Sequence, residues 1–285
     1  MNKKTAFSLA LLAFLNLAGP AAAAGSAFDQ IKSSKAINLG YRENSAPFSS
    51  VGPDKQPQGY SIDLCKVVAA DLAQQLGVDK LDVRWVPVTA QSRFELLKSG
   101  KIDIECGNTT QTLTRRADFD FSVMTFADGA SLLFRKGAIP AGSDHLTGQR
   151  IAVVTGTTTE KALEALGASA RLGATLVKVA DHDAALKALA DGKASAYSAD
   201  RTVLLTGALA SGNAGNYELS PVQITYEPYG LMMRPDQQLR LAVDRSLSRL
   251  YRTGAIMPIF QRWFASLGTP GEGLKAMFLL NAMPE

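Results

Sequence analysis

The chain has 285 residues, of which 46% are hydrophobic, and its 30 basic and 26 acidic side chains give a formal net charge of +4. This length is enough for two domains of ordinary size. The charge is close to neutral and no basic stripe alternates with aromatic residues, so the composition argues against nucleic acid as a partner.

The first 24 residues have the pattern of a cleavable signal peptide. Lys3 and Lys4 form a charged start, residues 6–17 an apolar core, and the alanines of 21–24 a small-residue cleavage site. The apolar core is shorter than the ~20 residues that a membrane-spanning helix needs. We therefore expect an exported protein that is soluble after cleavage, with an uncleaved membrane anchor as the alternative.

Strands and helices alternate in a first block, residues 36–125. Alternating or apolar runs predict strands over 36–42, 81–88 and 101–106. Apolar residues at helical spacing predict helices over 61–77 and 92–100. We expect Ser61 to cap the longer helix and Gly77 to end it.

The same alternation fills a second block, residues 150–220, and is followed by amphipathic helices. The expected strands cover 150–154, 174–179 and 194–198, and the expected helices cover 159–167, 183–192, 200–212, 237–254 and 256–268. This order predicts an α/β fold whose mostly parallel sheets are flanked by helices. Residues 125–131 and 226–232 each contain a glycine and would connect two lobes as a two-strand hinge, with a cleft between the lobes.

Two cysteines in an exported chain raise the question of a disulfide. Cys65 falls in the first turns of a predicted helix, and Cys106 ends a predicted strand. In a βαβ arrangement these two places are close together. A disulfide and two separate buried thiols both fit the sequence.

Polar side chains follow the predicted strands, close to their carboxyl ends. They are Arg42, Arg93, Asn108, Thr110, Thr157, Thr158, His182 and Asp200. Open parallel sheets bind their ligands just outside these strand ends. We therefore expect the side chains to surround a single site.

The residue types in this set indicate the ligand. Three arginines, the two above and Arg115, suit anionic oxygens, because a guanidinium donates a planar fork that matches a carboxylate. The turn at Thr157 and Thr158 would add the N-terminus of a helix, which also attracts anions. Asp200 would accept an ammonium. One ammonium and two carboxylates describe an acidic amino acid.

Structural roles are the alternatives for several of these residues. Thr157 and Glu160 have the spacing of a capping box, and Asp200 has the position of a helix N-cap. Arg115 could belong to a solvated charge pair with Asp118, and His182 could be a surface turn residue.

Other chemistries have less support. The sequence contains no phosphate-binding P-loop and no GxGxxG motif. With two histidines and no Cys/His cluster, a zinc site is not expected. We expect no catalytic residue, no cofactor and no metal.

Several segments resemble a known family. "GYRENSAPFS", "GYSIDLC", "PVTAQSR", "LLKSGKIDIECGNTTQTLTRR", "VTGTTTE", "DHDAALKALADGKASAYSAD" and "YGLMMR" are similar to the periplasmic amino-acid-binding proteins of ABC transporters, solute-binding protein family 3, in their glutamate/aspartate-binding branch. The similarity runs from about residue 36 to 265. It implies a two-lobed type II periplasmic-binding-protein fold, with lobe 1 formed by 25–127 plus 230–285 and lobe 2 by 128–229. It further implies a monomer that closes over its ligand and docks on a permease in the inner membrane.

The resemblance also assigns roles to individual residues. Arg115, Thr110 and Thr158 would hold the α-carboxylate of the ligand, Asn108 would lie near the amino group, and Asp200 would bind that ammonium. The side-chain carboxylate would be held by Arg42, Arg93 and His182. Ala90 and Asn108 stand where the branch usually has serine, which leaves the choice between glutamate and aspartate open.

Two other functions are compatible with the same fold. One is a periplasmic enzyme similar to the cyclohexadienyl or arogenate dehydratases, since fold alone does not determine function. The other is a ligand-sensing partner of a receptor. Neither has a dedicated motif in the sequence.

Overall fold

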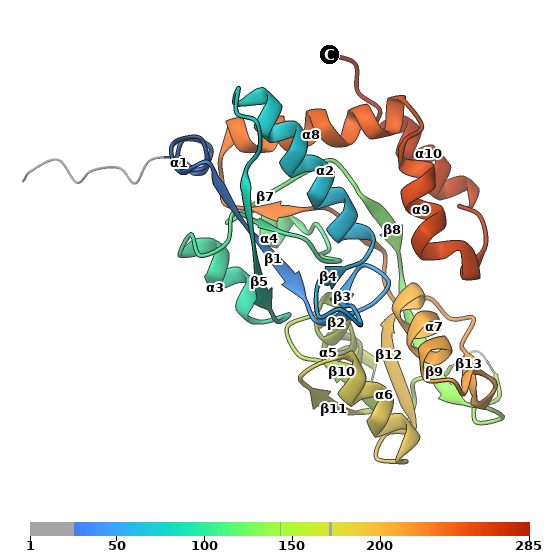
Figure 1. Ribbon diagram of the computed structural model, residues 1–285. Helices are drawn as coiled ribbons and strands as arrows, with labels where there is room; N and C mark the ends of the chain where they lie inside the picture. The colour runs from blue at the N-terminus through green and yellow to red at the C-terminus, as the bar shows by residue number, and fades with distance from the viewer. Residues whose placement is uncertain (1–25, 143, 171–172) are drawn as a thin grey trace, which may run out of the picture.

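The computed structural model describes residues 26–285 apart from 143 and 171–172. The predicted signal peptide, residues 1–24, lies outside the described residues. Two five-stranded sheets, each flanked by helices, form two halves of the molecule (Figure 1). None of the helices in the described ranges combines the length and the apolar character that crossing a membrane requires.

The first sheet has the order β5-β1-β6-β15-β7. Its strands are β1 (Ala36–Arg42), β5 (Asp82–Val88), β6 (Ile104–Glu105), β7 (Asp120–Phe121) and β15 (Met232–Met233). Both β5 and β6 run parallel to β1, as the sequence predicted. Strand β15 was not predicted and pairs antiparallel with β6 and β7, so one strand of this sheet comes from far along the chain.

Helices from both ends of the chain cover the first sheet (Figure 1). They are α1 (Ala27–Ser34), α2 (Tyr60–Gln75), α3 (Ser92–Lys98), α4 (Leu113–Arg116), α8 (Gln237–Arg252), α9 (Ile256–Phe264), the 3-10 turn η2 (Ala265–Leu267) and α10 (Glu272–Leu280). The apolar stripe of α8 packs on α2 because its spacing puts Leu239, Val243 and Leu247 on one buried face. A small sheet lies beside them, formed by β2 (Asn44–Ser45), β3 (Ser49–Val51) and β4 (Pro57–Gln58).

The start of α2 differs from the sequence prediction. Gly59, and not Ser61, occupies the N-cap position, and Ser61 is buried inside the helix. Gly59 has φ 136°, and a Cβ at this position would lie 2.2 Å from the carbonyl oxygen of Phe48. The close approach of these two backbone segments therefore requires glycine.

The second sheet has the order β11-β10-β12-β9-β13. Its strands are β9 (Ala130–Arg135), β10 (Arg150–Val154), β11 (Thr175–Val179), β12 (Ala196–Asp200) and β13 (Tyr217–Leu219), and its helices are α5 (Thr158–Ala170), α6 (His182–Ala190), α7 (Arg201–Ala210) and the turn η1 (Ala214–Asn216). Strands β11, β10 and β12 are parallel, as predicted. The remaining two pairings, β12 with β9 and β9 with β13, are antiparallel.

Two strands carry the chain between the sheets. Strand β8 (Phe126–Asp128) leads into the second sheet, β14 (Glu227–Tyr229) leads back, and the two pair antiparallel. Their aromatic side chains join a cluster with Phe48, Tyr60 and Phe264 in which ring centroids lie 5.0–6.3 Å apart. The crossing is therefore packed firmly against the helices of the first sheet.

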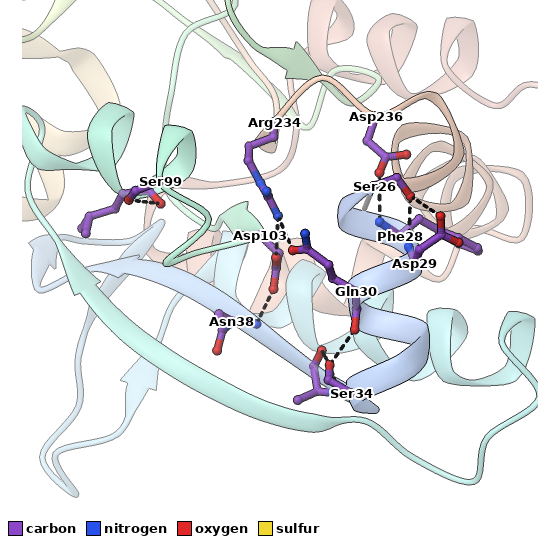
Figure 2. A network of polar contacts seen from close by, with 12 residues as sticks. Ser26, Phe28, Asp29, Gln30, Ser34, Asn38, Ser99, Asp103, Arg234 and Asp236 are labelled. Carbon is purple, nitrogen blue, oxygen red and sulfur yellow. Dashed lines mark hydrogen bonds and ion pairs between the residues drawn. The ribbon is translucent and has the colours of Figure 1, made fainter. Parts of the chain in front are cut away.

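A polar network attaches the N-terminal helix to the first sheet, as Figure 2 shows. Arg234 donates to Gln30 of α1 at 3.2 Å and forms an ion pair with Asp103 at 3.4 Å. Asp103 also accepts from the backbone of Asn38 in β1 at 2.8 Å. Asp236, the N-cap of α8, accepts from the backbone of Phe28 at 2.9 Å. The network joins the first and last parts of the chain on one side of the sheet.

Cys65 and Cys106 form a disulfide, with their Cα atoms 6.2 Å apart. This decides between the two alternatives that the sequence left open. The disulfide links α2 to the residue that directly follows β6. Asn108 comes two residues later, so the covalent link fixes the segment that leads into the predicted site.

Removing this disulfide should lower stability. Cross-linking two residues 41 positions apart reduces the entropy of the unfolded chain, which corresponds to about 4 kcal/mol in the chain-entropy model. We expect Cys65→Ala/Cys106→Ala to lose roughly this free energy of unfolding in a urea titration. A reducing agent should shift the wild-type midpoint in the same direction and leave the double variant unchanged. Equal midpoints for wild type and variant would contradict the prediction.

Candidate functional site

A cavity lies between the carboxyl ends of the two sheets. Its walls are formed by Arg42, Arg93, Asn108, Thr110, Arg115, Val154, Thr157, Thr158, Thr159, His182, Ser198, Ala199 and Asp200. All eight residues that the sequence singled out for ligand binding are among them. The structure therefore brings this set together from both halves of the molecule, and its binding role stays a prediction.

Three buried arginines form the wall on the side of the first sheet. Arg42 ends β1, which points toward the second sheet, while Arg93 lies in α3 and Arg115 in α4 (Figure 1). Burial, reinforced by the charge of Arg93, lowers the pKa of Arg42 to about 10 and that of Arg115 to about 9. Both of these pKa values lie above neutral pH, so Arg42 and Arg115 give the wall a positive charge.

One hydrogen bond each orients the guanidinium groups of Arg93 and Arg115. Arg93 Nη1 donates to Thr109 Oγ1 at 2.6 Å, and Arg115 Nη1 donates to the carbonyl oxygen of Thr110 at 2.7 Å. Arg115 is therefore a buried residue of the site, and the alternative of a solvated pair with Asp118 is wrong. Fixing the side chains in advance lowers the entropy that a ligand would otherwise lose on binding.

The opposite wall begins at the N-terminus of α5. Thr157 accepts from the backbone of Glu160 at 3.1 Å, and the Glu160 carboxylate accepts from the backbone of Gly156 at 2.8 Å. Thr157 therefore caps the helix, as the capping-box alternative predicted, and it also lines the cavity. Thr158 starts the helix and turns its hydroxyl toward Thr110, with the two oxygens 3.3 Å apart.

His182 lies at the start of α6, where Asp181 caps the helix by accepting from the backbone of Ala184 at 2.8 Å. Its Nδ1 lies 2.6 Å from the hydroxyl oxygen of Tyr197. Burial, followed by the positive charge of Arg42, lowers the pKa of His182 to about 3. The imidazole is therefore neutral at physiological pH. His182 lines the cavity, so the alternative of a surface turn residue is wrong.

Asp200 ends β12 and occupies the N-cap position of α7, but its side chain makes no capping hydrogen bond. It accepts instead from Asn108 Nδ2 at 3.3 Å and from the hydroxyl of Tyr229. Burial, followed by the charges of Glu227 and Asp128, raises the pKa of Asp200 well above its usual range. This carboxylate is directed into the cavity and is poorly solvated, as expected of an acceptor for a cationic group.

Sequence reasoning missed Glu227 of the returning strand β14. This buried carboxylate accepts from Thr110 on the first half, and from Thr158 on the second half at 2.7 Å. No periodicity marks it, since it lies in a three-residue strand. The sequence placed Glu105 near the predicted site, but nothing there marked it as buried, and it assigned no role to Thr109; both residues lie behind Arg93.

The two halves are in close contact around the cavity, whose volume is about 20 Å³. Ala90 is fully buried, and its carbonyl oxygen would lie 3.2 Å from a Cβ at Gly156. Gly156 has φ +82°, which also favours glycine. Within the ranges that the structure describes, no group of three or more His, Cys, Asp or Glu residues is placed to hold a metal ion.

Comparison with known proteins supports the same interpretation of the fold. The family described as bacterial extracellular solute-binding proteins, family 3, matches residues 37–266. The L-glutamate/L-aspartate-binding protein of Pseudomonas aeruginosa is 32% identical over 88% of this chain and 84% of its own length. The glutamate/aspartate import solute-binding protein of Escherichia coli K12 is 31% identical over 96% and 91%. A crystal structure of a variant of ArgBP from T. maritima has a TM-score of 0.73 and 25% identity, covering 84% of this chain and 99% of that chain.

The depressed pKa of His182 predicts an acid-sensitive fold. As the pH falls below about 6.5, the unfolded chain takes up a proton that the native imidazole takes up only near pH 3. The native state therefore loses up to about 1.4 kcal/mol of stability per pH unit within this window. In thermal melts between pH 7 and 4, His182→Asn should show a shallower decline in Tm than wild type. Parallel curves would show that His182 does not remain neutral in the native state.

Proposed function

The chain belongs to the bacterial extracellular solute-binding proteins, family 3, and we propose that it captures glutamate or aspartate between its two lobes and delivers this amino acid to an ABC permease. It has the two-lobed type II periplasmic-binding-protein fold. The observation that carries the proposal is the meeting of three arginines, a neutral histidine and one buried aspartate in a single cavity between the lobes.

The charges favour an acidic ligand. A neutral amino acid offers one carboxylate, which a single arginine satisfies. Arg42 and Arg93 would then stay buried with too little negative charge around them, which is costly in a poorly solvated site. A second carboxylate at the far end of the ligand satisfies both of them.

We assign the two ends of the ligand as follows. Arg115, Thr110 and Thr158 bind the α-carboxylate at the N-terminus of α5, where the helix dipole adds attraction. Asp200 and Asn108 bind the α-ammonium. Arg42, Arg93 and His182 bind the side-chain carboxylate. Hydrogen bonds to charged groups contribute roughly 1.5–3 kcal/mol each. After the cost of association, several of them are enough for micromolar affinity, about −8 kcal/mol.

Binding would require the lobes to separate and close again. We propose that lobe 1 comprises 25–127 plus 230–285, that lobe 2 comprises 128–229, and that β8 and β14 form the hinge. An amino acid needs more room than the present cavity offers, so the contact between Asn108 and Asp200 must open to admit it. The aromatic cluster at the crossing would confine this motion to the ends of the two strands.

The remaining parts of the proposal concern location and assembly. We propose that residues 1–24 are removed as a signal peptide, that the mature protein acts as a monomer in the periplasm, and that its partner is a permease of the inner membrane. The named relatives are solute-binding proteins and not enzymes. Release of product from a carboxylate such as prephenate by the purified protein would instead favour the dehydratase alternative.

Calorimetric titration tests the ligand class. We expect glutamate or aspartate to bind with micromolar affinity or better, and glutamine and arginine to bind at least roughly a hundredfold more weakly. The physical reason is that neither of these last two ligands carries a distal anion for Arg42 and Arg93. Tighter binding of glutamine than of both acids would refute the assignment.

Two substitutions test separately the residues assigned to the two ends of the ligand. Arg115→Ala should weaken all amino acids by a similar factor, because each of them has an α-carboxylate. Arg42→Ala should weaken the acids by about 2 kcal/mol and leave glutamine nearly unchanged. Unfolding curves of both variants check that the fold is retained. Equal losses for acids and amides in both variants would show that the division of roles is wrong.

A further inference from the structure

A buried carboxylate stands behind the two arginines that would meet the distal end of the ligand. Glu105 is the last residue of β6, is fully buried, and does not belong to the cavity wall. It lies in register with Gly40, two residues before Arg42 in β1. Its position behind the two arginines raises the question of what its charge does there.

A hydroxyl group connects this carboxylate to one of the arginines. Arg93 Nη1 donates to Thr109 Oγ1 at 2.6 Å, and the same hydroxyl donates to Glu105 Oε2 at 2.7 Å. Thr109 is completely buried. Because its single proton goes to Glu105, its oxygen is free to accept from the guanidinium. The contact from Arg93 to Glu105 is therefore fixed in direction and shielded from water.

The second carboxylate oxygen and the side chain of the other arginine both lie against Gly107. Among the described residues, Glu105 Oε1 has no hydrogen-bond partner. A Cβ at Gly107 would lie 2.2 Å from this oxygen and 3.2 Å from Cγ of Arg42, so a larger residue there would displace the Glu105 carboxylate. Burial lowers the pKa of Arg42 and of Arg93, and the charge of Glu105 opposes this effect on each. Glu105 thus acts as the resident counter-ion of the pair.

The distal end of the site consequently holds at most one net positive charge, from two guanidinium groups and the Glu105 carboxylate. The neutral imidazole of His182 adds none. Asp181, at the start of α6, acts on Arg42 in the same direction as Glu105. Beyond this end of the site, Arg93 also interacts with Asp200 and with Arg115, which the proposed function assigns to the two α-groups of the ligand.

Such a site discriminates by charge as well as by shape. Doubling the charge of a ligand group doubles its attraction to the site, whereas its Born desolvation cost increases with the square of the charge. Because the distal end of the site holds at most one net positive charge and little water, it does not compensate the second negative charge of a dianion.

We propose that Glu105 is a specificity-determining residue that restricts the distal group of the ligand to a monoanion, such as a carboxylate, and excludes dianions, such as a phosphate monoester. This inference rests on the proposed function, because it assumes that Arg42 and Arg93 meet the distal end of an amino acid. Glu105 does so without touching the ligand, by setting the charge of the residues that do.

The test uses two amino acids of nearly identical shape. L-Serine O-sulfate carries a monoanionic ester at every pH used, whereas O-phospho-L-serine gains its second negative charge near pH 6. We expect wild type to bind both with similar affinity at pH 5, and to favour the sulfate ester by at least about tenfold at pH 7.5. Glu105→Gln should lose or reverse the preference at pH 7.5. The sulfate ester also corrects for any titration of the protein itself.

Two further variants distinguish the charge of Glu105 from its hydrogen bond and from its buried position. Thr109→Val breaks the hydroxyl contact but keeps the charge of Glu105, so it should weaken both esters and leave their ratio at pH 7.5 unchanged. Glu43→Gln removes the same charge from an exposed position next to Arg42 and should change neither the affinities nor the ratio. Should Glu105→Gln fail to fold, the pH dependence of the wild-type ratio still tests the proposal.

The outcomes are distinguishable from those of the proposed function. If wild type binds glutamate but Glu105→Gln keeps the wild-type ratio, or if the wild-type ratio is the same at pH 5 and 7.5, this inference fails alone. Binding of glutamate without any binding of either ester would mean selection by shape, and it would also overturn the inference. A wild type that binds neither glutamate nor aspartate overturns both.

Discussion

Three guanidinium groups share one poorly solvated space, and carboxylates around them offset the free-energy cost of burying their charges. Each buried cation requires hydrogen bonds and opposite charge nearby, since burial without partners costs several kcal/mol. Glu105 of β6, Asp200 of β12 and Glu227 of β14 provide that charge from three different strands. The site is therefore distributed over both sheets and the crossing between them, and no single segment of the chain could form it.

The fold meets this requirement through the direction of its strands. In parallel strands, the carboxyl ends meet at one edge, which gathers Arg42 after β1 and Asp200 after β12 at the same gap. The aromatic cluster at β8 and β14 holds the crossing against the first sheet, while the hydroxyls of Thr110 and Thr158 meet at Glu227. Aromatic packing thus holds the crossing in place, and the hydrogen bonds to Glu227 hold the two halves together at the cavity.

Sequence patterns predicted the elements that have a clear period and the residues that follow them. The runs at 36–42 and 150–154 are such strands, and all eight predicted site residues line one cavity. Strand β15 escaped prediction because its two residues pair with partners more than 100 positions away, which leaves no local pattern. Glu227 was missed, and Glu105 was given no role in binding, because the importance of both residues comes from their neighbours in space. The disulfide needed a distance that spacing along the chain does not give.

Strand β15 also affects the order in which the molecule can be completed. The second sheet is built from residues 130–219 and has all of its strands once that stretch is available. The first sheet starts earlier in the chain but lacks a strand between β6 and β7 until Met232 and Met233 arrive. A chain that emerges N-terminus first can therefore finish its middle portion before its beginning. Until then, β6 and β7 keep open edges that β15 covers in the finished protein.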